Sequence, residues 1–214
     1  MSVIRMNSRE VIYLSERDWR LKHLMQAVGD LEYRRADSAF HSLAHSIIEQ
    51  MLSMKAGQVI EGRLLELGDG ELEAARIAAL SPEAIKACGM SMRKAQNLRA
   101  LAEYALENDL EAMGNLSDAE ISSELQKLPG IGKWTTDMFL LFYLERPDVL
   151  PVEDGAVKQV FKWLYEAPIT SPEVQFVVCS LWQPYSSTAV RYLYRALNTG
   201  LVRNNDSSSF LWSR

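Results

Sequence analysis

Apolar positions along this chain recur mostly at helical spacing. Leu21, Leu24 and Met25 fall on one face of a helix, because residues three and four positions apart are neighbours there. A longer apolar-periodic stretch runs from Ser38 to Leu67 and stops at the Gly-Asp-Gly turn of residues 68–70. No pair of strands joined by a hairpin turn stands out, so the pattern predicts an all-α fold.

Residues suited to the N-cap position mark where several of these helices begin. Ser81-Pro82 and Ser171-Pro172 each combine an N-cap serine with proline at the first helical position. Ser117 with Glu120 has the spacing of a capping box, and Ser15 with Asp18 resembles one. The predicted helices cover about residues 15–29, 38–53, 55–67, 71–79, 82–87, 91–108, 118–126, 133–145, 154–164, 172–181 and 186–197. Residues 203–209 are predicted to form a loose tail.

The string Leu-Pro-Gly-Ile-Gly-Lys at residues 128–133 joins two of the predicted helices. Gly130 and Gly132 permit a tight turn and close approach by a phosphate. Backbone N–H groups at the start of the second helix can bind that phosphate, and Lys133 adds a cation beside it. An ordinary helix–helix connection would explain a lone Gly-x-Gly, but the whole string favours a helix-hairpin-helix DNA-binding element.

A carboxylate follows this hairpin: Asp154 stands 22 positions beyond Gly132. If the hairpin holds DNA, this carboxylate, a short distance away along the chain, could do chemistry on the bound DNA. The start of the next predicted helix would help to keep Asp154 ionised. Taken alone, Asp154 is explained equally well as the cap of that helix. Glu153 is the close competitor and is expected to be exposed or supportive.

Composition and charge narrow the class of protein. Of 214 residues, 48% are apolar and 24% charged, which predicts a soluble globular protein. The longest apolar run, Met138 to Leu144, is too short to cross a membrane, and residues 1–10 contain no apolar signal core, so export is not expected. The net charge of −5 argues mildly against nucleic acid, but local patches decide phosphate contacts. Basic residues lie beside the candidate contact segments, namely Lys55, Arg63, Arg93, Lys94, Arg99, Lys133 and Lys158.

Cysteine and histidine usage indicates no metal centre. Cys88 and Cys179 form no metal-spaced pair, which favours a reducing compartment and excludes a four-cysteine iron–sulfur cluster within the chain. His41 and His45 are four residues apart on a predicted helix, but no third ligand accompanies them. Structural or surface roles are therefore favoured for these histidines.

With the hairpin and Asp154, the chain resembles the helix-hairpin-helix DNA glycosylase superfamily, and most of all its 3-methyladenine DNA glycosylase II branch. The resemblance also rests on segments 49–56, 89–98, 150–158 and 182–189. It implies one glycosylase unit over residues 1–214, with two helical lobes and the active cleft between them. One lobe would span 40–145 and carry the hairpin, and the other would combine 1–39 with 146–214.

The resemblance implies a monofunctional enzyme that flips an alkylated purine out of double-stranded DNA and hydrolyses its N-glycosidic bond. Asp154 would be the catalytic residue. Trp134, Met138 and Tyr185 would form the base pocket, because aromatic faces attract a cationic base. Trp182 would either join this pocket or belong to the core. Met138 and Tyr185 depart from the most familiar pattern, and Ser186 replaces a basic residue often found there, so the lesion range stays open.

DNA contacts are implied for Gly130, Gly132, Lys133, Gln50, Met51 and Lys94. Met51 would fill the gap left by the flipped base, unless it packs in the core of its own helix. Trp134 stands where relatives resembling endonuclease III carry a nucleophilic lysine. Tryptophan cannot form a Schiff base, so no lyase activity is expected.

The resemblance also implies a possible Na⁺ or K⁺ ion on the main-chain carbonyls of Gln126, Leu128 and Ile131, with no cofactor required. The expected partner is duplex DNA containing a damaged base, with no membrane partner. The protein is expected to be a monomer in the bacterial cytoplasm or nucleoid, or in a eukaryotic nucleus. Two alternatives remain: a non-catalytic DNA-binding module, and a glycosylase for a deaminated purine or uracil.

Overall fold

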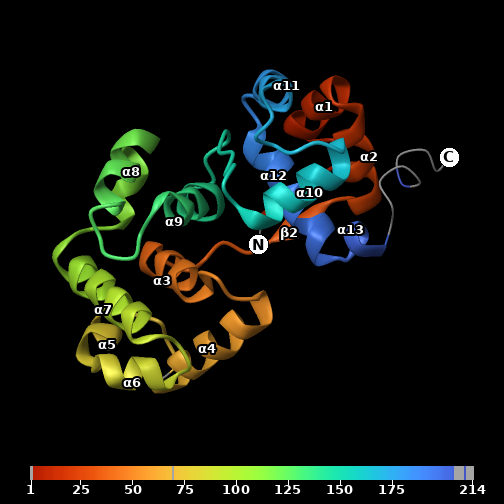
Figure 1. Cartoon of the computed structure of the whole chain (residues 1–214). Helices are drawn as coiled ribbons and strands as arrows, with labels where there is room; N and C mark the ends of the chain where they lie inside the picture. The colour runs from red at the N-terminus through yellow and green to blue at the C-terminus, as the bar shows by residue number, and fades with distance from the viewer. Residues whose placement is uncertain (1, 69, 205–209, 211–214) are drawn as a thin grey trace. The chain divides into compact units, whose positions relative to one another are not determined.

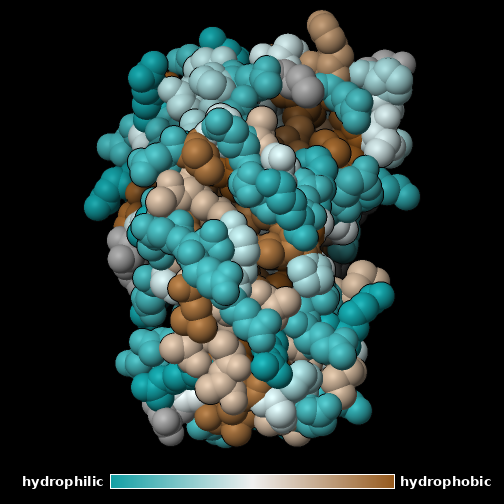
Figure 2. Space-filling view, turned by 90° about the vertical axis from the view of Figure 1, so that its left-hand side faces the viewer, coloured by the Kyte–Doolittle hydropathy of each residue, from teal (hydrophilic) through white to brown (hydrophobic). Residues whose placement is uncertain are grey.

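The computed structural model describes residues 2–68, 70–204 and 210. It divides into two compact units: unit 1 comprises Met1–Arg35 and Glu145–Arg214, and unit 2 comprises Ala36–Leu144 (Figure 1). Helices dominate both units, which confirms the all-α class. Within the described residues, no helix is long and apolar enough to cross a membrane. Hydrophilic residues cover most of the face drawn in Figure 2, with smaller hydrophobic areas between them.

Unit 1 contains a two-stranded antiparallel sheet and helices that pack around α12. Its elements are β1 (Ser2–Ile4), α1 (Arg9–Arg17), α2 (Trp19–Val28), β2 (Leu31–Tyr33), α10 (Gly155–Tyr165), α11 (Pro172–Trp182), α12 (Ser186–Asn198) and α13 (Leu201–Asn204). Helix α12 packs on α10 and α2, where Phe161, Leu21 and Tyr192 are fully buried. The strands, each three residues long, were missed because such short segments carry no readable alternation. The first two residues of the predicted loose tail, 203 and 204, are instead the end of α13, and residues 205–209 lie outside the described residues.

The single helix predicted over residues 15–29 is wrong. The structure has α1 and α2 there, separated at Asp18, and Asp18 rather than Ser15 caps the second helix. Its Oδ1 accepts from the backbone N–H groups of Arg20 (3.1 Å) and Leu21 (3.0 Å). Its Oδ2 accepts from the Tyr165 hydroxyl and from Trp182 Nε1. The Asp18 carboxylate thus separates the two helices by capping the second one. It can be buried there because its four hydrogen-bond donors offset the cost of removing its charge from water.

Unit 2 is built around α3, which contacts α4, α7, α9 and η2. Its elements are α3 (Ala39–Glu49), α4 (Met54–Leu67), α5 (Ala74–Ala79), α6 (Pro82–Ala87), α7 (Met92–Glu107), the 3₁₀ helix η1 (Glu111–Asn115), α8 (Asp118–Leu125), α9 (Lys133–Met138) and the π-helical turn η2 (Phe139–Tyr143). The cap of α6 at Ser81 and the capping box at Ser117 are confirmed. Leu43, Ile47 and Phe139 are fully buried in its core.

Two predicted helices of unit 2 end earlier than expected. The helix predicted to reach residue 53 stops at Glu49, because Gln50 has a non-helical ψ of 123° and Met51 has a φ of 58°. The helix predicted over 133–145 is α-helical only to Met138 and then widens into η2, where the N–H of Leu144 donates to Phe139 O over five residues. Both changes occur next to segments that carry candidate site residues.

Candidate active site

The hairpin joins α8 to α9 in unit 2. Glycine occupies positions 130 and 132 for different structural reasons. Gly130 has a φ of 80°, and a Cβ at this position would lie 2.1 Å from Asn97 Nδ2. Gly132 has a φ of −111° and would place a Cβ in open space, with nothing within 4 Å. The fold therefore requires glycine at 130, whereas at 132 glycine leaves the backbone accessible to a ligand.

Lys133 does not stand alone beside the hairpin. Its ammonium group donates to both carboxylate oxygens of Asp137, at 2.8 and 2.9 Å, one turn along α9. Asp137 is 8% exposed; burial raises its pKa, and the hydrogen bond and charge of Lys133 oppose that rise. Asp137 was not among the predicted site residues, although its spacing of four residues from Lys133 is that of a helical ion pair.

The turn between α3 and α4 presents Met51 to solvent, where its side chain is fully exposed. The core alternative for Met51 is therefore wrong. Gln50 points the other way and donates through Nε2 to Gly130 O at 2.8 Å and Thr135 Oγ1 at 3.0 Å. A pocket of about 470 Å³ adjoins this turn and is lined by Gln50, Met51, Ser91, Arg93, Lys94, Asn97, Pro129 and Gly130. The structure thus brings most of the predicted DNA contacts of unit 2 together.

Asp154 lies in unit 1, at the N-cap of α10. Its side chain is 6% exposed, and Oδ1 accepts from the N–H of Val157 at 2.8 Å. The preceding loop is held on α12, since Val149 N–H donates to Ser187 Oγ at 2.9 Å. Glu153 is exposed and pairs with Lys158 at 2.7 Å, as expected of a supporting residue. The cap bond fixes the orientation of the Asp154 carboxylate, and an ionised carboxylate has further acceptor sites.

The predicted pocket residues are distributed over both units. Trp134 and Met138 belong to α9 of unit 2, where Trp134 is partly exposed and Met138 is buried. Tyr185, in unit 1, is partly exposed and caps α12. Trp182 is fully buried among Phe161 and Tyr165 and donates to Asp18. Its assignment to the base pocket is therefore replaced by the core alternative, because its ring is packed and its one donor is used.

A family model described as "HhH-GPD superfamily base excision DNA repair protein" matches residues 44–184. The chain belongs to the HhH-GPD superfamily. The matched segment runs from α3 to the residue before Tyr185, and it includes the hairpin and Asp154.

Named relatives of this HhH-GPD protein include DNA-3-methyladenine glycosylase 1 of Schizosaccharomyces pombe, 28% identical over 86% of this chain and 85% of the relative. DNA-3-methyladenine glycosylase 2 of Escherichia coli is 28% identical over 73% of this chain and 57% of its own length. Among solved structures, a DNA-3-methyladenine glycosidase from Bacillus halodurans has a TM-score of 0.81 and 30% identity, covering 100% of both chains. The S. pombe 3-methyladenine DNA glycosylase in complex with abasic DNA has a TM-score of 0.79 and 27% identity, covering 90% and 97%.

Tyr13, which contacts the predicted pocket residue Tyr185, and Arg17, which lies over the Tyr13 ring, were not predicted from the sequence. The Tyr13 ring meets Tyr185 edge-on, with centroids 5.0 Å apart, and its hydroxyl donates to Gln183 O at 2.6 Å. The Arg17 guanidinium lies 3.6 Å from the Tyr13 ring centroid. Both residues belong to α1, of which only the C-terminal end lies within the helix predicted over residues 15–29, and about 170 residues separate them from Tyr185, so no local pattern could have linked them.

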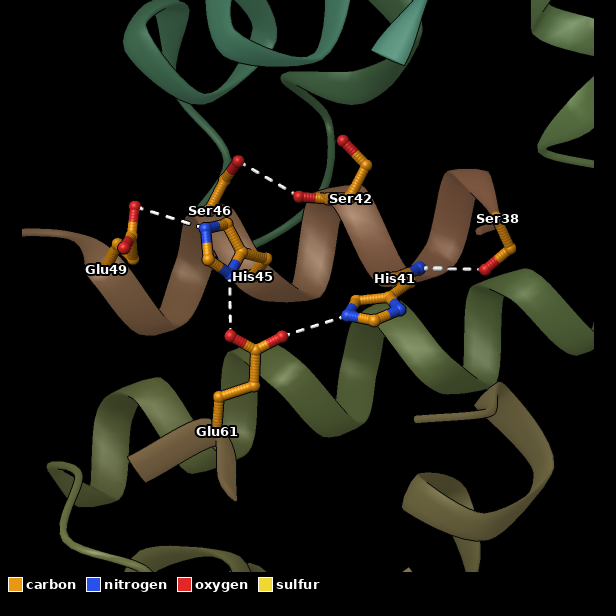
Figure 3. Close-up of polar contacts among 7 residues, drawn as sticks. All are labelled: Ser38, His41, Ser42, His45, Ser46, Glu49 and Glu61. Atoms are coloured by element: carbon orange, nitrogen blue, oxygen red, sulfur yellow. Dashed lines mark hydrogen bonds and ion pairs between the residues drawn. The ribbon is translucent and has the colours of Figure 1, made fainter. Parts of the chain in front are cut away.

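The two histidines of α3 share the carboxylate of Glu61, a contact that was not predicted from the sequence. Glu61 of α4 accepts from His41 Nε2 at 2.9 Å and His45 Nδ1 at 2.7 Å, and His45 Nε2 lies 3.3 Å from Glu49 (Figure 3). Within the part of the chain that the structure describes, no group of three or more His, Cys, Asp or Glu residues is arranged to hold a metal ion. Hydrogen bonds to Glu49 and Glu61 raise the pKa of His45 to about 10, against burial. Burial acts to raise the pKa of Glu61, but its bonds with His41 and His45 outweigh burial and lower it to about 2.

This cluster predicts a pH dependence of stability. Because the folded pKa of His45 exceeds its unfolded value of about 6.5, its contribution is complete below that pH and is lost as the pH rises towards about 10. The folded pKa of Glu61 is lowered, so its contribution is lost as the pH falls from about 4.5 towards 2. The His45 side chain is 41% exposed, so screening limits the alkaline loss to about 1 kcal/mol. Urea unfolding of the wild type between pH 6 and 10 should show this loss, and Glu49→Gln, which removes the largest cause of the raised pKa of His45, should remove most of it. Equal pH dependence in both proteins would refute the assignment.

Proposed function

We propose that this HhH-GPD protein is a monofunctional DNA glycosylase that excises alkylated purines of the 3-methyladenine and 7-methylguanine type. It hydrolyses the N-glycosidic bond and leaves an abasic site for base excision repair. The observation that carries the proposal is the placement of Asp154: a buried, oriented carboxylate at the N-cap of α10, inside the segment that matches the family model. The relatives named as 3-methyladenine glycosylases support the substrate class.

In this proposal, Asp154 stabilises the positive charge that develops on the sugar. As the bond to the base breaks, positive charge grows on the sugar, and a fixed carboxylate in a poorly hydrated site stabilises it more than water does. The cap bond from Val157 holds the carboxylate in place before the reaction begins. The chemistry needs an ionised carboxylate, and this one lies at the N-terminal end of α10, where the helix dipole is positive.

The base is held and replaced by separate residues. Trp134 and Tyr185 offer aromatic faces to an electron-poor alkylated purine, a contact worth about 0.5–2 kcal/mol each. Met138 lies one turn after Trp134 on α9 and accompanies it. Met51, exposed at the turn before α4, enters the stack where the base has left it.

Hydrolysis without strand cleavage follows from the residues after the hairpin. Trp134 occupies the position at which a lyase would need its amine nucleophile. Lys133, the nearest amine in the sequence, is bound by Asp137 at 2.8 Å. The enzyme therefore has water as its nucleophile and leaves the abasic strand intact.

The hairpin holds the backbone of duplex DNA through Gly132 and the start of α9, and the carbonyls of Gln126, Leu128 and Ile131 would hold a Na⁺ or K⁺ ion there. Carbonyl oxygens suit hard cations, and Leu128 O, which accepts from Ile131 N–H at 3.2 Å, has a second lone pair for the ion. We propose that the protein acts as a monomer on chromosomal DNA, in a bacterial nucleoid or a eukaryotic nucleus.

A panel of duplexes tests the substrate class. Each duplex contains one 7-methylguanine, 3-methyladenine analogue, hypoxanthine or uracil, and free base is measured under single-turnover conditions. We expect the alkylated purines to be released at least about tenfold faster than hypoxanthine or uracil, because the pocket selects by stacking on a cationic ring. Faster release of uracil or hypoxanthine would move the protein to another lesion class, and binding without release of any base would leave the non-catalytic alternative.

A further inference from the structure

The turn that presents Met51 is strained and is held from outside. Met51 has a φ of 58°, which is unfavourable for a side chain other than glycine, asparagine or aspartate. Its side chain is fully exposed, so packing does not hold it there. The restraint has to come from the neighbouring backbone.

Lys94 supplies that restraint. Its Nζ donates to Ile48 O at 2.7 Å and to Gln50 O at 2.6 Å. These carbonyls belong to the last turn and the C-cap of α3, where a helix end leaves its acceptors without intrahelical partners. One ammonium group therefore fixes the backbone on the N-terminal side of Met51.

The same turn is tied to the hairpin. Gln50 Nε2 donates to Gly130 O at 2.8 Å and to Thr135 Oγ1 at 3.0 Å. On α7, Asn97 lies three residues beyond Lys94 and so close to Gly130 that no Cβ fits between them. Helix α7 thus contacts the Met51 turn through Lys94 and the hairpin through Asn97, and Gln50 connects the two.

We propose that Lys94 is a positioning residue, whose ammonium group keeps Met51 in register with the hairpin so that the wedge enters the base stack while the hairpin holds the backbone. This inference rests on the proposed function. It replaces the expectation that Lys94 contacts DNA. Its ammonium group already has two carbonyl acceptors and is partly desolvated, and burial lowers its pKa. Arg93, next to it in sequence, is exposed and better placed for a phosphate.

The two roles make different predictions for DNA binding. A residue that neutralises a phosphate contributes to the salt dependence of affinity, and its removal lowers the slope of log K against log salt by about one. A positioning residue leaves that slope unchanged and slows a step after binding. Base flipping is that step, because it requires the wedge to be in place as the base leaves the stack.

The test uses Lys94→Gln, the matched charge control Arg93→Gln, and Met51→Ala alone and combined with Lys94→Gln. Single-turnover excision is measured at saturating protein, and affinity for the same duplex at several salt concentrations. We expect Lys94→Gln to slow excision roughly 10- to 100-fold with an unchanged salt slope, because losing the clamp lets a strained turn relax. Arg93→Gln, which removes a positive charge exposed to a phosphate, should reduce the salt slope. In the Met51→Ala background, Lys94→Gln should cost less than about threefold, since residues acting as one unit are not additive.

Three results would overturn the proposal: a salt slope lowered by about one in Lys94→Gln, unchanged excision at saturation, or full additivity with Met51→Ala. Hydrogen exchange of the free protein gives a readout independent of activity. The Leu52 amide donates to Glu49 O at 2.9 Å across the turn, so Lys94→Gln should accelerate its exchange and Arg93→Gln should not. If the wild type releases no base, the proposed function fails, and the exchange rates still decide whether Lys94 holds the turn.

Discussion

Replacing Asp154 by asparagine is expected to reduce base excision by about 10³-fold or more at saturating protein. Asparagine has nearly the same shape but no negative charge, so it cannot stabilise a developing cation on the sugar. It is also a favourable N-cap residue, so the bond from Val157 and the start of α10 should persist. Single-turnover release of 7-methylguanine, measured by chromatography, gives the rate.

The matched control is Glu153→Gln, which neutralises the adjacent carboxylate. Glu153 is exposed and pairs with Lys158 on the surface, so its loss should change excision less than about threefold. DNA affinity of Asp154→Asn should stay within a few-fold of the wild type. If Asp154→Asn excises at the wild-type rate while Glu153→Gln does not, the catalytic carboxylate has been assigned to the wrong residue.

The second large effect is expected at the hairpin. Gly130→Ala should lower the stability of the protein, whereas Gly132→Ala should weaken DNA binding. Gly130→Ala should lower the free energy of unfolding by about 2–4 kcal/mol, because its φ of 80° disfavours a side chain and the new Cβ would overlap Asn97. Gly132→Ala meets open space at an ordinary φ and should cost less than about 1 kcal/mol. Its methyl group should nevertheless weaken DNA binding about tenfold or more, because it occupies the space through which a phosphate reaches the backbone.

Urea unfolding and DNA titration of both variants separate these effects. The decisive comparison is Gly132→Ala, which tests DNA contact in a protein whose fold is retained. Wild-type affinity in Gly132→Ala would show that the hairpin backbone does not bind the phosphate. A stable Gly130→Ala protein would show that the hairpin accepts another backbone conformation.

Local motifs made the hairpin and the Asp154 segment predictable. These motifs are short-range features of the sequence: the glycines and proline of residues 128–133, the N-cap serines, and the spacing from the hairpin to Asp154. Each can be recognised without knowing which distant segments are in contact. The family resemblance also singled out Gln50 and Met51, but it did not predict the early end of α3 that exposes Met51. That helix end depends on Lys94, more than 40 residues away, which supplies the hydrogen bonds that replace another helical turn.

The features of the fold and of the candidate site that were not predicted depend on contacts between segments that are distant in sequence. Asp18 divides the first predicted helix because its partners Tyr165 and Trp182 come from about 150 residues away. The same contact moves Trp182 from the expected pocket into the core. Glu61 joins His41 and His45 across two helices, which no spacing within one helix could indicate.

The most direct test of the proposed function is incubation of the wild-type protein with methylated duplex DNA. Free bases are separated by chromatography, and the DNA strand is examined before and after alkali. The account predicts free 3-methyladenine or 7-methylguanine, with strands that remain intact until alkali cleaves them at the abasic sites. Absence of any released base, or strand breaks before alkali treatment, would contradict it.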